Sequence, residues 1–267
     1  MIADTQHHAA TRPSAAAVAL SAFVAAMQTL TRVPVTSVAA PTAQALAWSA
    51  VFYPLVGLLL GAAGVVVYLL ALSFFPSTLA ALLVIAVWIL LTGALHEDGI
   101  ADTFDAFGSQ HSRDDILRVM KDSRIGVYGA LALAISLLLR WQTLAALPSG
   151  EIVAALVASQ VFPRAGIVTL AFLAGPATGG TGGAFAAALR TRHVVFAWLL
   201  AAALLAPLQE WRAMMAVMSV CLVIVIAARR FFHRRLGGVT GDCLGAANQI
   251  QEVVVLLVIL GLSGASH

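Results

Sequence analysis

Long runs of apolar residues divide this chain, and they restrict its possible folds more than any other feature. The runs cover roughly 15–30, 47–74, 78–95, 129–147, 152–174, 195–207, 213–228 and 252–264. A helix needs about 20 predominantly apolar residues to cross the hydrocarbon core of a bilayer. Only 10% of the residues are charged, whereas a soluble domain carries about a quarter. We therefore expect an all-α fold, a polytopic integral membrane helical bundle forming a single domain over residues 1–267, with about seven transmembrane helices.

The N-terminal region differs from the other apolar runs. The run 15–30 is rich in alanine and weakly hydrophobic, so this additional helix either spans the bilayer or lies in its interface. We expect residues 1–13 to form a flexible arm, because they lack the basic start, compact apolar core and cleavage site of a signal peptide. Cys221 and Cys243 have neither the pattern of a disulfide framework nor the spacing of metal ligands.

The basic residues predict an orientation. Seven alternating spans would place the N-terminal arm and the segments 31–46, 96–128, 175–194 and 229–251 on one side of the membrane. Twelve of the 15 Lys and Arg residues lie there: Arg12, Arg32, Arg113, Arg118, Lys121, Arg124, Arg190, Arg192, Arg229, Arg230, Arg234 and Arg235. The positive-inside rule assigns that side to the cytoplasm and gives the opposite face Arg140 and Arg212.

The acidic residues sort in the same way, although the positive-inside rule does not require it. Nine of the 12 Asp and Glu residues belong to the predicted cytoplasmic side, which indicates a chemical site there. The sequence pI is about 9.3, but the cations are not clustered on a soluble domain. We therefore expect no nucleic-acid partner, and membrane lipid as the surroundings.

The most informative acidic segment is HEDGIADTFDAF, at the end of an apolar run. On a helix, Asp98, Asp102 and Asp105 are spaced i, i+4 and i+7, so their carboxylates project from one face. Like charges at that spacing repel unless a cation lies among them, and hard oxygen ligands suit Mg²⁺ that bridges to substrate phosphates. The alternative is a solvated acidic helix end. The absence of Lys and Arg from 93–112 favours the metal site.

Two further segments carry charges at predicted membrane boundaries. In RVMKDSRIG, the cations Arg118, Lys121 and Arg124 flank Asp122, and they either hold a phosphate or set the topology. In GGVTGD, glycines leave the Asp242 carboxylate with little steric cover, which favours a site. The glycine-rich GPATGGTGGAF has no strand before it and no GK[ST] after it, so we expect a flexible interhelical loop.

Three single residues complete the candidates. His96 is a general base, a ligand or a structural hydrogen-bonding group. Arg32 is a phosphate-binding residue or a juxtamembrane charge. Arg164 lies inside an apolar run, where a guanidinium is costly and usually faces a cavity or an acidic partner, so it joins the substrate-binding candidates.

These motifs resemble one family. LTRVPV at 30–35, GALHEDGIADTFDAF at 93–107, MKDSRIGVYG at 120–129 and GGVTGDCLGA at 237–246 are similar, in order and spacing, to the cobalamin synthases, also called adenosylcobinamide-GDP ribazoletransferases. The resemblance covers residues 30 to 252. It implies an enzyme of the bacterial inner membrane whose site faces the cytoplasm. A hydroxyl of α-ribazole, or of its 5'-phosphate, attacks the cobinamide-linked phosphorus of adenosylcobinamide-GDP and expels GMP, with Mg²⁺ required.

The resemblance also implies roles for the candidate residues. Asp98, Asp102 and Asp105 would hold one or two Mg²⁺ ions with Glu97 in support. Arg124, Lys121 and Arg32 would contact phosphate oxygens. Asp122 and Asp242 would complete the polar pocket. The clustered acids are also similar to those of the CDP-alcohol phosphotransferases, but their DG-x2-AR core is absent, since Gly99 is followed by Ile100, Ala101 and Asp102.

Two other classes of protein compete with this enzyme. A secondary transporter would explain Arg164, but it predicts charges spread along the membrane midplane and an inverted repeat, neither of which is evident. A membrane scaffold leaves HEDGIADTFD without a role. The oligomeric state is open, with a homodimer as the working expectation.

Overall fold

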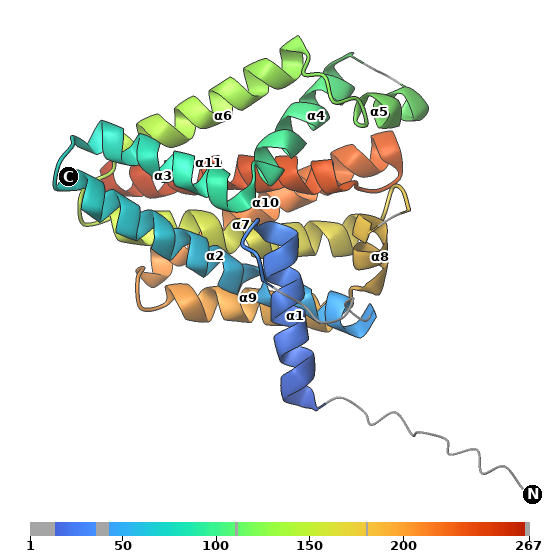
Figure 1. Ribbon diagram of the computed structural model, residues 1–267, viewed down its shortest axis with the longest axis horizontal. Coiled ribbons are helices and arrows are strands. Elements are labelled where there is room, and N and C mark those ends of the chain that lie inside the picture. The colour runs from blue at the N-terminus through green and yellow to red at the C-terminus, as the bar shows by residue number, and fades with distance from the viewer. Residues whose placement is uncertain (1–13, 36–42, 110–111, 180, 265–267) are drawn as a thin grey trace, which may run out of the picture.

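The computed structural model describes residues 14–35, 43–109, 112–179 and 181–264. The predicted arm at 1–13, with Arg12, lies outside them. The described residues form helices joined by short connections (Figure 1). The helices are α1 (Ala15–Leu30), α2 (Ala43–Leu72), α3 (Ser77–Thr92), α4 (Leu95–Ser109), α5 (Arg113–Val119), α6 (Val127–Ala146), α7 (Ile152–Ala174), α8 (Thr181–Ala188), α9 (Thr191–Leu205), α10 (Trp211–Leu236) and α11 (Gly241–Gly264). The all-α polytopic prediction is confirmed.

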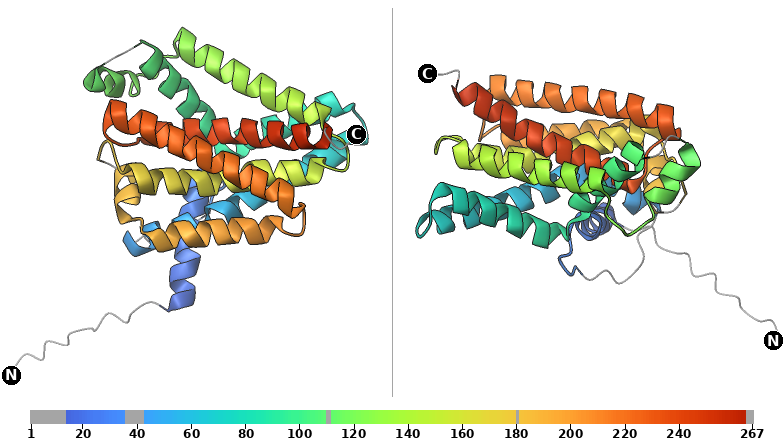
Figure 2. Two further views of the ribbon diagram at one scale, coloured as in Figure 1. Left: turned by 180° about the vertical axis from the view of Figure 1, so that it is seen from behind. Right: turned by 90° about the horizontal axis from the view of Figure 1, so that it is seen from above.

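Helix α7 is the centre of the bundle. Of its most apolar 18-residue window, 94% is buried, and α2, α9, α10 and α11 all pack against it. Seen from behind, α10 and α11 lie over α7 (Figure 2). Small residues allow the closest approach, since a Cβ added to Gly61 of α2 would lie 2.8 Å from the Val157 Cα. Such contacts matter in a bilayer, because burial from lipid gives apolar helices no hydrophobic gain.

The number of spanning helices is smaller than the predicted seven. In the described residues, five helices are long and apolar enough to cross a membrane: α2, α6, α7, α10 and α11. A sixth span results if α3 and α4, which meet at 88°, are counted together. Helix α9 has 15 residues, which span about 22 Å at 1.5 Å per residue. It falls short of the hydrocarbon thickness, and it packs on α2 and α7 through one buried face.

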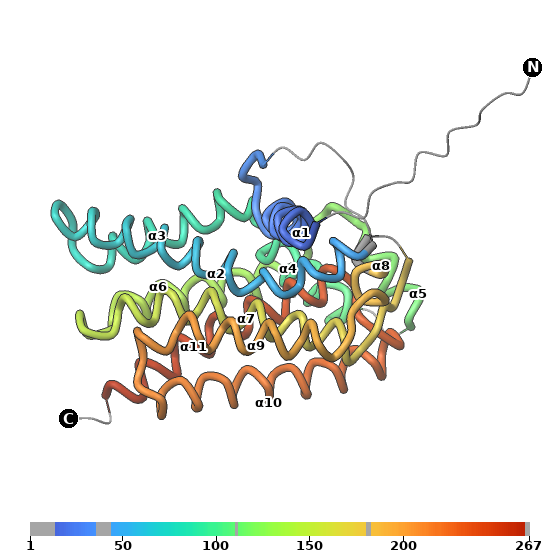
Figure 3. Tube along the Cα trace, turned by 90° about the horizontal axis from the view of Figure 1, so that it is seen from below, coloured from blue at the N-terminus to red at the C-terminus, as the bar shows by residue number. Residues whose placement is uncertain are grey.

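The N-terminal helix α1 lies across the bundle. It packs on α2 and crosses the long helices at a steep angle, so that it is seen end-on in Figure 3. Its 16 residues are also too few for a span that follows the bundle axis. Of the two predicted arrangements, the crosswise course supports an interfacial helix.

A sharp bend between α3 and α4 creates the local geometry of the site. Gly93 ends α3 in the left-handed region at φ 66°, and its N–H donates to Ile89 O. Ala94 follows at φ 60°, a conformation that is uncommon for a residue with a Cβ. These two successive left-handed residues turn the chain, so that α4 runs at 88° to α3. The first turn of α4 therefore buries Glu97 in the bundle and leaves Asp98 exposed beside it, rather than placing both in a distant loop.

Candidate functional site

Helices α4 and α11 touch at backbone level. A Cβ added to Gly99 would lie 2.9 Å from the carbonyl oxygen of Asp242 and 3.0 Å from the Cα of Gly245. Any side chain at position 99 would push the helices apart. This contact explains how two motifs distant in sequence meet, because it brings Asp242, in the first turn of α11, beside Asp98.

Three carboxylates converge at this contact, and we call Asp98, Asp102 and Asp242 the α4–α11 carboxylates. Asp98 is exposed, and the other two are half-buried. Asp102 experiences the charges of both partners, and Asp242 experiences that of Asp98. Within the described residues, none of the three forms an ion pair with Lys or Arg. The cluster therefore carries uncompensated negative charge, as the sequence predicted for Asp98 and Asp102.

The arrangement limits what kind of metal site is possible. Among the described residues, no group of three His, Cys, Asp or Glu side chains is close enough to hold an ion. Mg²⁺ in phosphate-transfer sites usually keeps several waters and is bound by one or two carboxylates plus substrate phosphates. Asp98 and Asp102 fit a site of that kind, which is complete only with substrate. A site of four protein carboxylates does not fit.

Asp105 also acts on Asp102 through its charge, but it differs from the α4–α11 carboxylates in its hydrogen bonds. Its side chain is buried, and its two carboxylate oxygens accept from the backbone N–H groups of Gly126 at 2.7 Å and Gly129 at 2.8 Å. These donors lie at the start of α6, so Asp105 caps that helix. The i+7 spacing was correct, but the structure gives this carboxylate a structural partner that the sequence did not predict.

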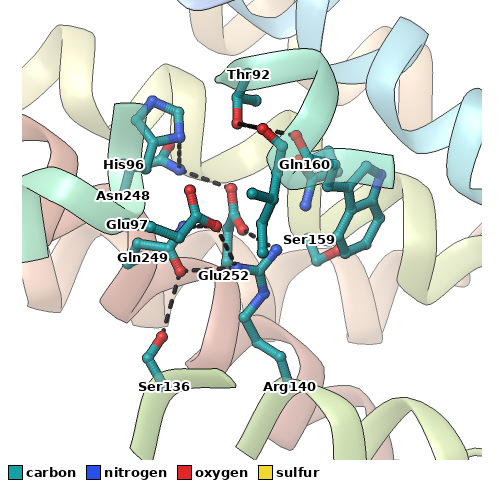
Figure 4. A network of polar contacts seen from close by, with 12 residues as sticks. Thr92, His96, Glu97, Ser136, Arg140, Ser159, Gln160, Asn248, Gln249 and Glu252 are labelled. Carbon is teal, nitrogen blue, oxygen red and sulfur yellow. Dashed lines mark hydrogen bonds and ion pairs between the residues drawn. The ribbon is translucent and has the colours of Figure 1, made fainter. Parts of the chain in front are cut away.

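Glu97 points away from the α4–α11 carboxylates into the bundle. One of its oxygens lies 2.9 Å from Arg140 Nη1, and Arg140 Nη2 lies 3.1 Å from Glu252 (Figure 4). Arg140 is 1% exposed, so its assignment to the opposite membrane face as a topology charge is wrong. The physical reason is local: a guanidinium on α6 turns inward, where α4 and α11 each supply a carboxylate.

Arg164 belongs to the same network. Its Nη1 lies 3.3 Å from Glu252 Oε1, and it is 0% exposed. Of the two environments predicted for this residue, the structure supports the acidic partner. We call Glu97, Arg140, Arg164, Asn248, Gln249 and Glu252 the buried charge network. Arg164 is enclosed in this network, so the structure does not bring it to the α4–α11 carboxylates.

His96 connects the network to the site. Its Nδ1 lies 3.0 Å from Asn248 Nδ2, which also donates to Glu252 at 2.7 Å. Because the amide nitrogen is a donor, Nδ1 accepts, and the proton of a neutral ring is on Nε2. His96 also lines a cavity beside Asp98 and Asp242. Sequence analysis did not assign Asn248 or Gln249 to a site, because no short motif marks a polar residue whose partners lie on other helices.

The segment with Lys121, Asp122 and Arg124 connects α5 to α6. Arg124 binds Asp122 through two nitrogens, with Nη2 at 2.7 Å from Oδ2 and Nε at 3.0 Å from Oδ1. This pairing lowers the pKa of the Asp122 carboxyl to about 2 and raises the pKa of Arg124. Lys121 is exposed. The structure therefore places these cations beyond the Asp105 cap and does not bring them into contact with the α4–α11 carboxylates.

Arg32 lies nearer to the acids. Its backbone N–H donates to Leu91 O at 2.7 Å, and its side chain packs against Gly93 at the bend. Arg32 and Asp98 line one cavity of about 430 Å³. A basic and an acidic side chain therefore face the same open space, as a site for phosphate and metal requires.

The glycine-rich segment after α7 is anchored. Val239 N–H donates to Gly175 O at 2.9 Å, and Ala177 N–H donates to Val239 O at 3.0 Å. Arg113 reaches from α5 to the Ala177 carbonyl at 2.7 Å. Helix α8 then begins at Thr181. The described part of the predicted flexible loop is thus tied to the connection before α11, while Gly180 lies outside the described residues.

Comparisons with known proteins agree with this geometry. A family model described as cobalamin-5-phosphate synthase matches residues 22–260. A protein of Ralstonia nicotianae named adenosylcobinamide-GDP ribazoletransferase is 40% identical over 238 residues, which are 86% of this chain and 91% of that protein. A Bradyrhizobium diazoefficiens protein of the same name is 42% identical over 209 residues, 77% of this chain and 80% of that protein. No solved structure matches the chain. By the extent of the family match and of these relatives, the chain belongs to the cobalamin-5-phosphate synthase family.

Proposed function

We propose that this protein transfers the adenosylcobinamide phosphoryl group of adenosylcobinamide-GDP to α-ribazole, or to its 5'-phosphate, and releases GMP. The relatives carry the name of this activity. The observation that supports it in this chain is the meeting of Asp98, Asp102 and Asp242 at the α4–α11 contact, next to a cavity shared with Arg32.

In this reaction, a ribazole hydroxyl forms a bond to the cobinamide-linked phosphorus. The bond from that phosphorus to the bridging oxygen breaks, and GMP leaves with that oxygen. Asp242 and His96 line a second cavity that also borders Asp98, so we assign to Asp242 the proton of the attacking hydroxyl. His96 offers Nε2–H, and we infer that it donates to substrate rather than acting as a base.

The diphosphate needs positive charge, because phosphoryl transfer depends mainly on positioning and charge neutralisation. We assign Mg²⁺ to Asp98 and Asp102 together with substrate oxygens; when bound, it would neutralise charge at the phosphorus. Arg32 would contact phosphate from the cavity wall. Arg124 and Lys121 would do so if their connection moves toward α4 when substrate binds, whereas Asp105 and Glu97 would act only through their helices.

We place the protein in the bacterial inner membrane with the α4–α11 carboxylates on the cytoplasmic side, since the positive-inside rule assigns the side that is rich in Lys and Arg to the cytoplasm. A homodimer stays a prediction. A transporter is disfavoured, because the buried charges Arg140 and Arg164 are paired with carboxylates, and the space among them is about 0 Å³.

The test is GMP release by the purified full chain in lipid nanodiscs. We expect GMP only when adenosylcobinamide-GDP, α-ribazole and Mg²⁺ are all present, and a cobamide product in equal amount. Hydrolysis without transfer, or no reaction with either form of ribazole, would contradict the proposal.

A further inference from the structure

A second cavity adjoins the α4–α11 carboxylates, and its walls are mainly apolar. It measures about 220 Å³, and its apolar lining residues include Leu30, Leu46, Tyr53, Ile167, Phe185 and Leu244. Asp98, Asp242 and His96 border it as well. We call it the apolar cavity. Asp98 therefore stands between two spaces, the apolar cavity and the more polar one that it shares with Arg32.

The size of the apolar cavity restricts its occupant. Pockets that enclose a whole drug-sized ligand measure about 300–1,000 Å³, and this one is smaller. It can take a bicyclic aromatic ring, but it cannot take a corrin macrocycle. The parts of the two substrates that are small enough to fit are the base of ribazole and the guanine and adenine of adenosylcobinamide-GDP.

The lining of the cavity restricts the chemistry of the ring that can occupy it. Tyr53 and Phe185 stack with ring centroids 5.4 Å apart and planes within 5°, and these two parallel rings form the aromatic wall of the cavity. The polar groups on this wall are already engaged, since Thr29 donates to Ala25 O at 2.7 Å and Tyr53 hydrogen-bonds to Thr29 and Ser49. A base with an exocyclic amino group, such as guanine or adenine, would find no free acceptor on this wall, where a buried donor without a partner is costly. The carboxylates that border the cavity, Asp98 and Asp242, lie instead at the α4–α11 contact.

We propose that the apolar cavity is the binding site for the base of the acceptor nucleoside, and that it selects an apolar bicyclic base. This inference rests on the proposed function and deepens it. With the base between Leu46 and the Tyr53–Phe185 wall, the ribose lies toward Asp98 and Asp242, where its hydroxyl meets the phosphorus. The corrin and the diphosphate stay outside, on the Arg32 side.

The experiment changes the size of the cavity at Leu46, which lies in the first turn of α2 and has no hydrogen-bonding side chain. Turnover is measured with two nucleosides, one carrying benzimidazole and one carrying naphthimidazole, which has one more fused ring. We expect wild type to prefer the bicyclic nucleoside at least about tenfold in kcat/KM. Leu46→Ala should reduce that preference about tenfold, since one or two methylenes in an apolar pocket change discrimination by 10–200-fold.

Leu46→Phe should raise the KM for the benzimidazole nucleoside about tenfold and leave the KM for adenosylcobinamide-GDP within about twofold. Leu58 is the matched control, because it is another half-buried leucine of α2 that packs on the same core and lines neither cavity. Leu58→Ala and Leu58→Phe should keep the wild-type preference. An adenine nucleoside should be at least about tenfold poorer than the benzimidazole one with wild type.

The ratio of the kcat/KM values for two nucleosides, measured with one preparation, does not depend on how much of the variant is folded. An unchanged ratio in Leu46→Ala, or an equal change in Leu58→Ala, would overturn the cavity assignment. GMP release by wild type tests the proposed function separately: its absence with every nucleoside would overturn both, whereas GMP release with an unchanged Leu46→Ala ratio would overturn only the cavity assignment.

Discussion

Asp102 and Asp105 lie less than one turn apart on α4, yet their surroundings give them different functions. Asp102 is half-buried and near two further carboxylates. Asp105 is saturated by two backbone donors. A carboxylate surrounded by other carboxylates gains by binding a cation, whereas one that accepts two N–H bonds is already stabilised as an anion. Asp102 and Asp105 therefore lead to two separate predictions, one about metal binding and one about stability.

The first prediction concerns the proposed metal ligand. Asp102→Asn should lower GMP release at least about a hundredfold and raise the Mg²⁺ concentration for half-maximal rate, because groups that only support metal ligands already cost about 10–100-fold. Asp114→Asn is the control, since that side chain is 94% exposed on α5. Mg²⁺ titrations of both variants provide the measurement. A normal Mg²⁺ dependence in Asp102→Asn would show that residues other than Asp102 hold the metal.

The second prediction separates Asp105 from that role. Asp105→Asn retains one acceptor for the two N–H groups of Gly126 and Gly129, so it should lower the free energy of unfolding by about 0.5–2 kcal/mol, as for the loss of a helix cap. Thermal unfolding in detergent measures the change. The Mg²⁺ concentration for half-maximal rate should stay at the wild-type value, and a shift as large as that of Asp102→Asn would make Asp105 a ligand after all.

At the scale of helices, the buried charge network joins α4, α6, α7 and α11. Arg140 of α6 bridges Glu97 of α4 and Glu252 of α11, and Arg164 of α7 also reaches Glu252. Two arginines and two glutamates balance in charge. Since the first turn of α4 carries both Glu97 and Asp98, the network holds in place the helix that presents the α4–α11 carboxylates.

The third prediction follows from this balance. Arg140→Ala leaves Glu97 without an ion-pair partner and Glu252 with Arg164 alone, and it should cost about 3–5 kcal/mol of unfolding free energy. Arg212→Ala, at the exposed start of α10, should change it by less than about 0.5 kcal/mol. Combining Arg140→Met with Glu97→Gln should cost less than Arg140→Ala alone, because the double change removes one uncompensated charge. Additive losses in the double variant would contradict a network in which the charges depend on one another.

Sequence patterns predicted the helices and missed how they meet. Apolar runs located α2, α7, α10 and α11, because span length and hydropathy are local properties. The 88° bend at Gly93 and Ala94 depends on what packs around it, and no local rule places a left-handed alanine. The same limit applies to the site: the carboxylates of α4 were identified, but their contact with α11 depends on Gly99 and Gly245 fitting together across the bundle.

The whole molecule has two unlike ends. Helix α5, the connection from α5 to α6, helix α8 and the turn before α11 lie at one end (Figure 1), where Arg113, Arg118, Lys121 and Arg124 are found. The connections between α2 and α3, α6 and α7, and α9 and α10 lie at the other end. Among the described residues, Arg212 is the only Lys or Arg in or next to those three connections. This asymmetry supports the orientation predicted from the sequence. The prediction included Arg140 among the surface charges, and the structure has it buried in the core.

The fourth prediction tests that orientation with single cysteines at the two ends. Both native cysteines are 0% exposed, so they should not react with a membrane-impermeant thiol reagent. Asp114→Cys marks the α5 end, and Gly150→Cys marks the α6–α7 connection, where an added Cβ meets nothing within 4 Å. In intact cells whose outer membrane has been made permeable, Gly150→Cys should be labelled rapidly and Asp114→Cys only after lysis. The reverse labelling pattern would contradict both the orientation and the cytoplasmic supply of substrate that we propose.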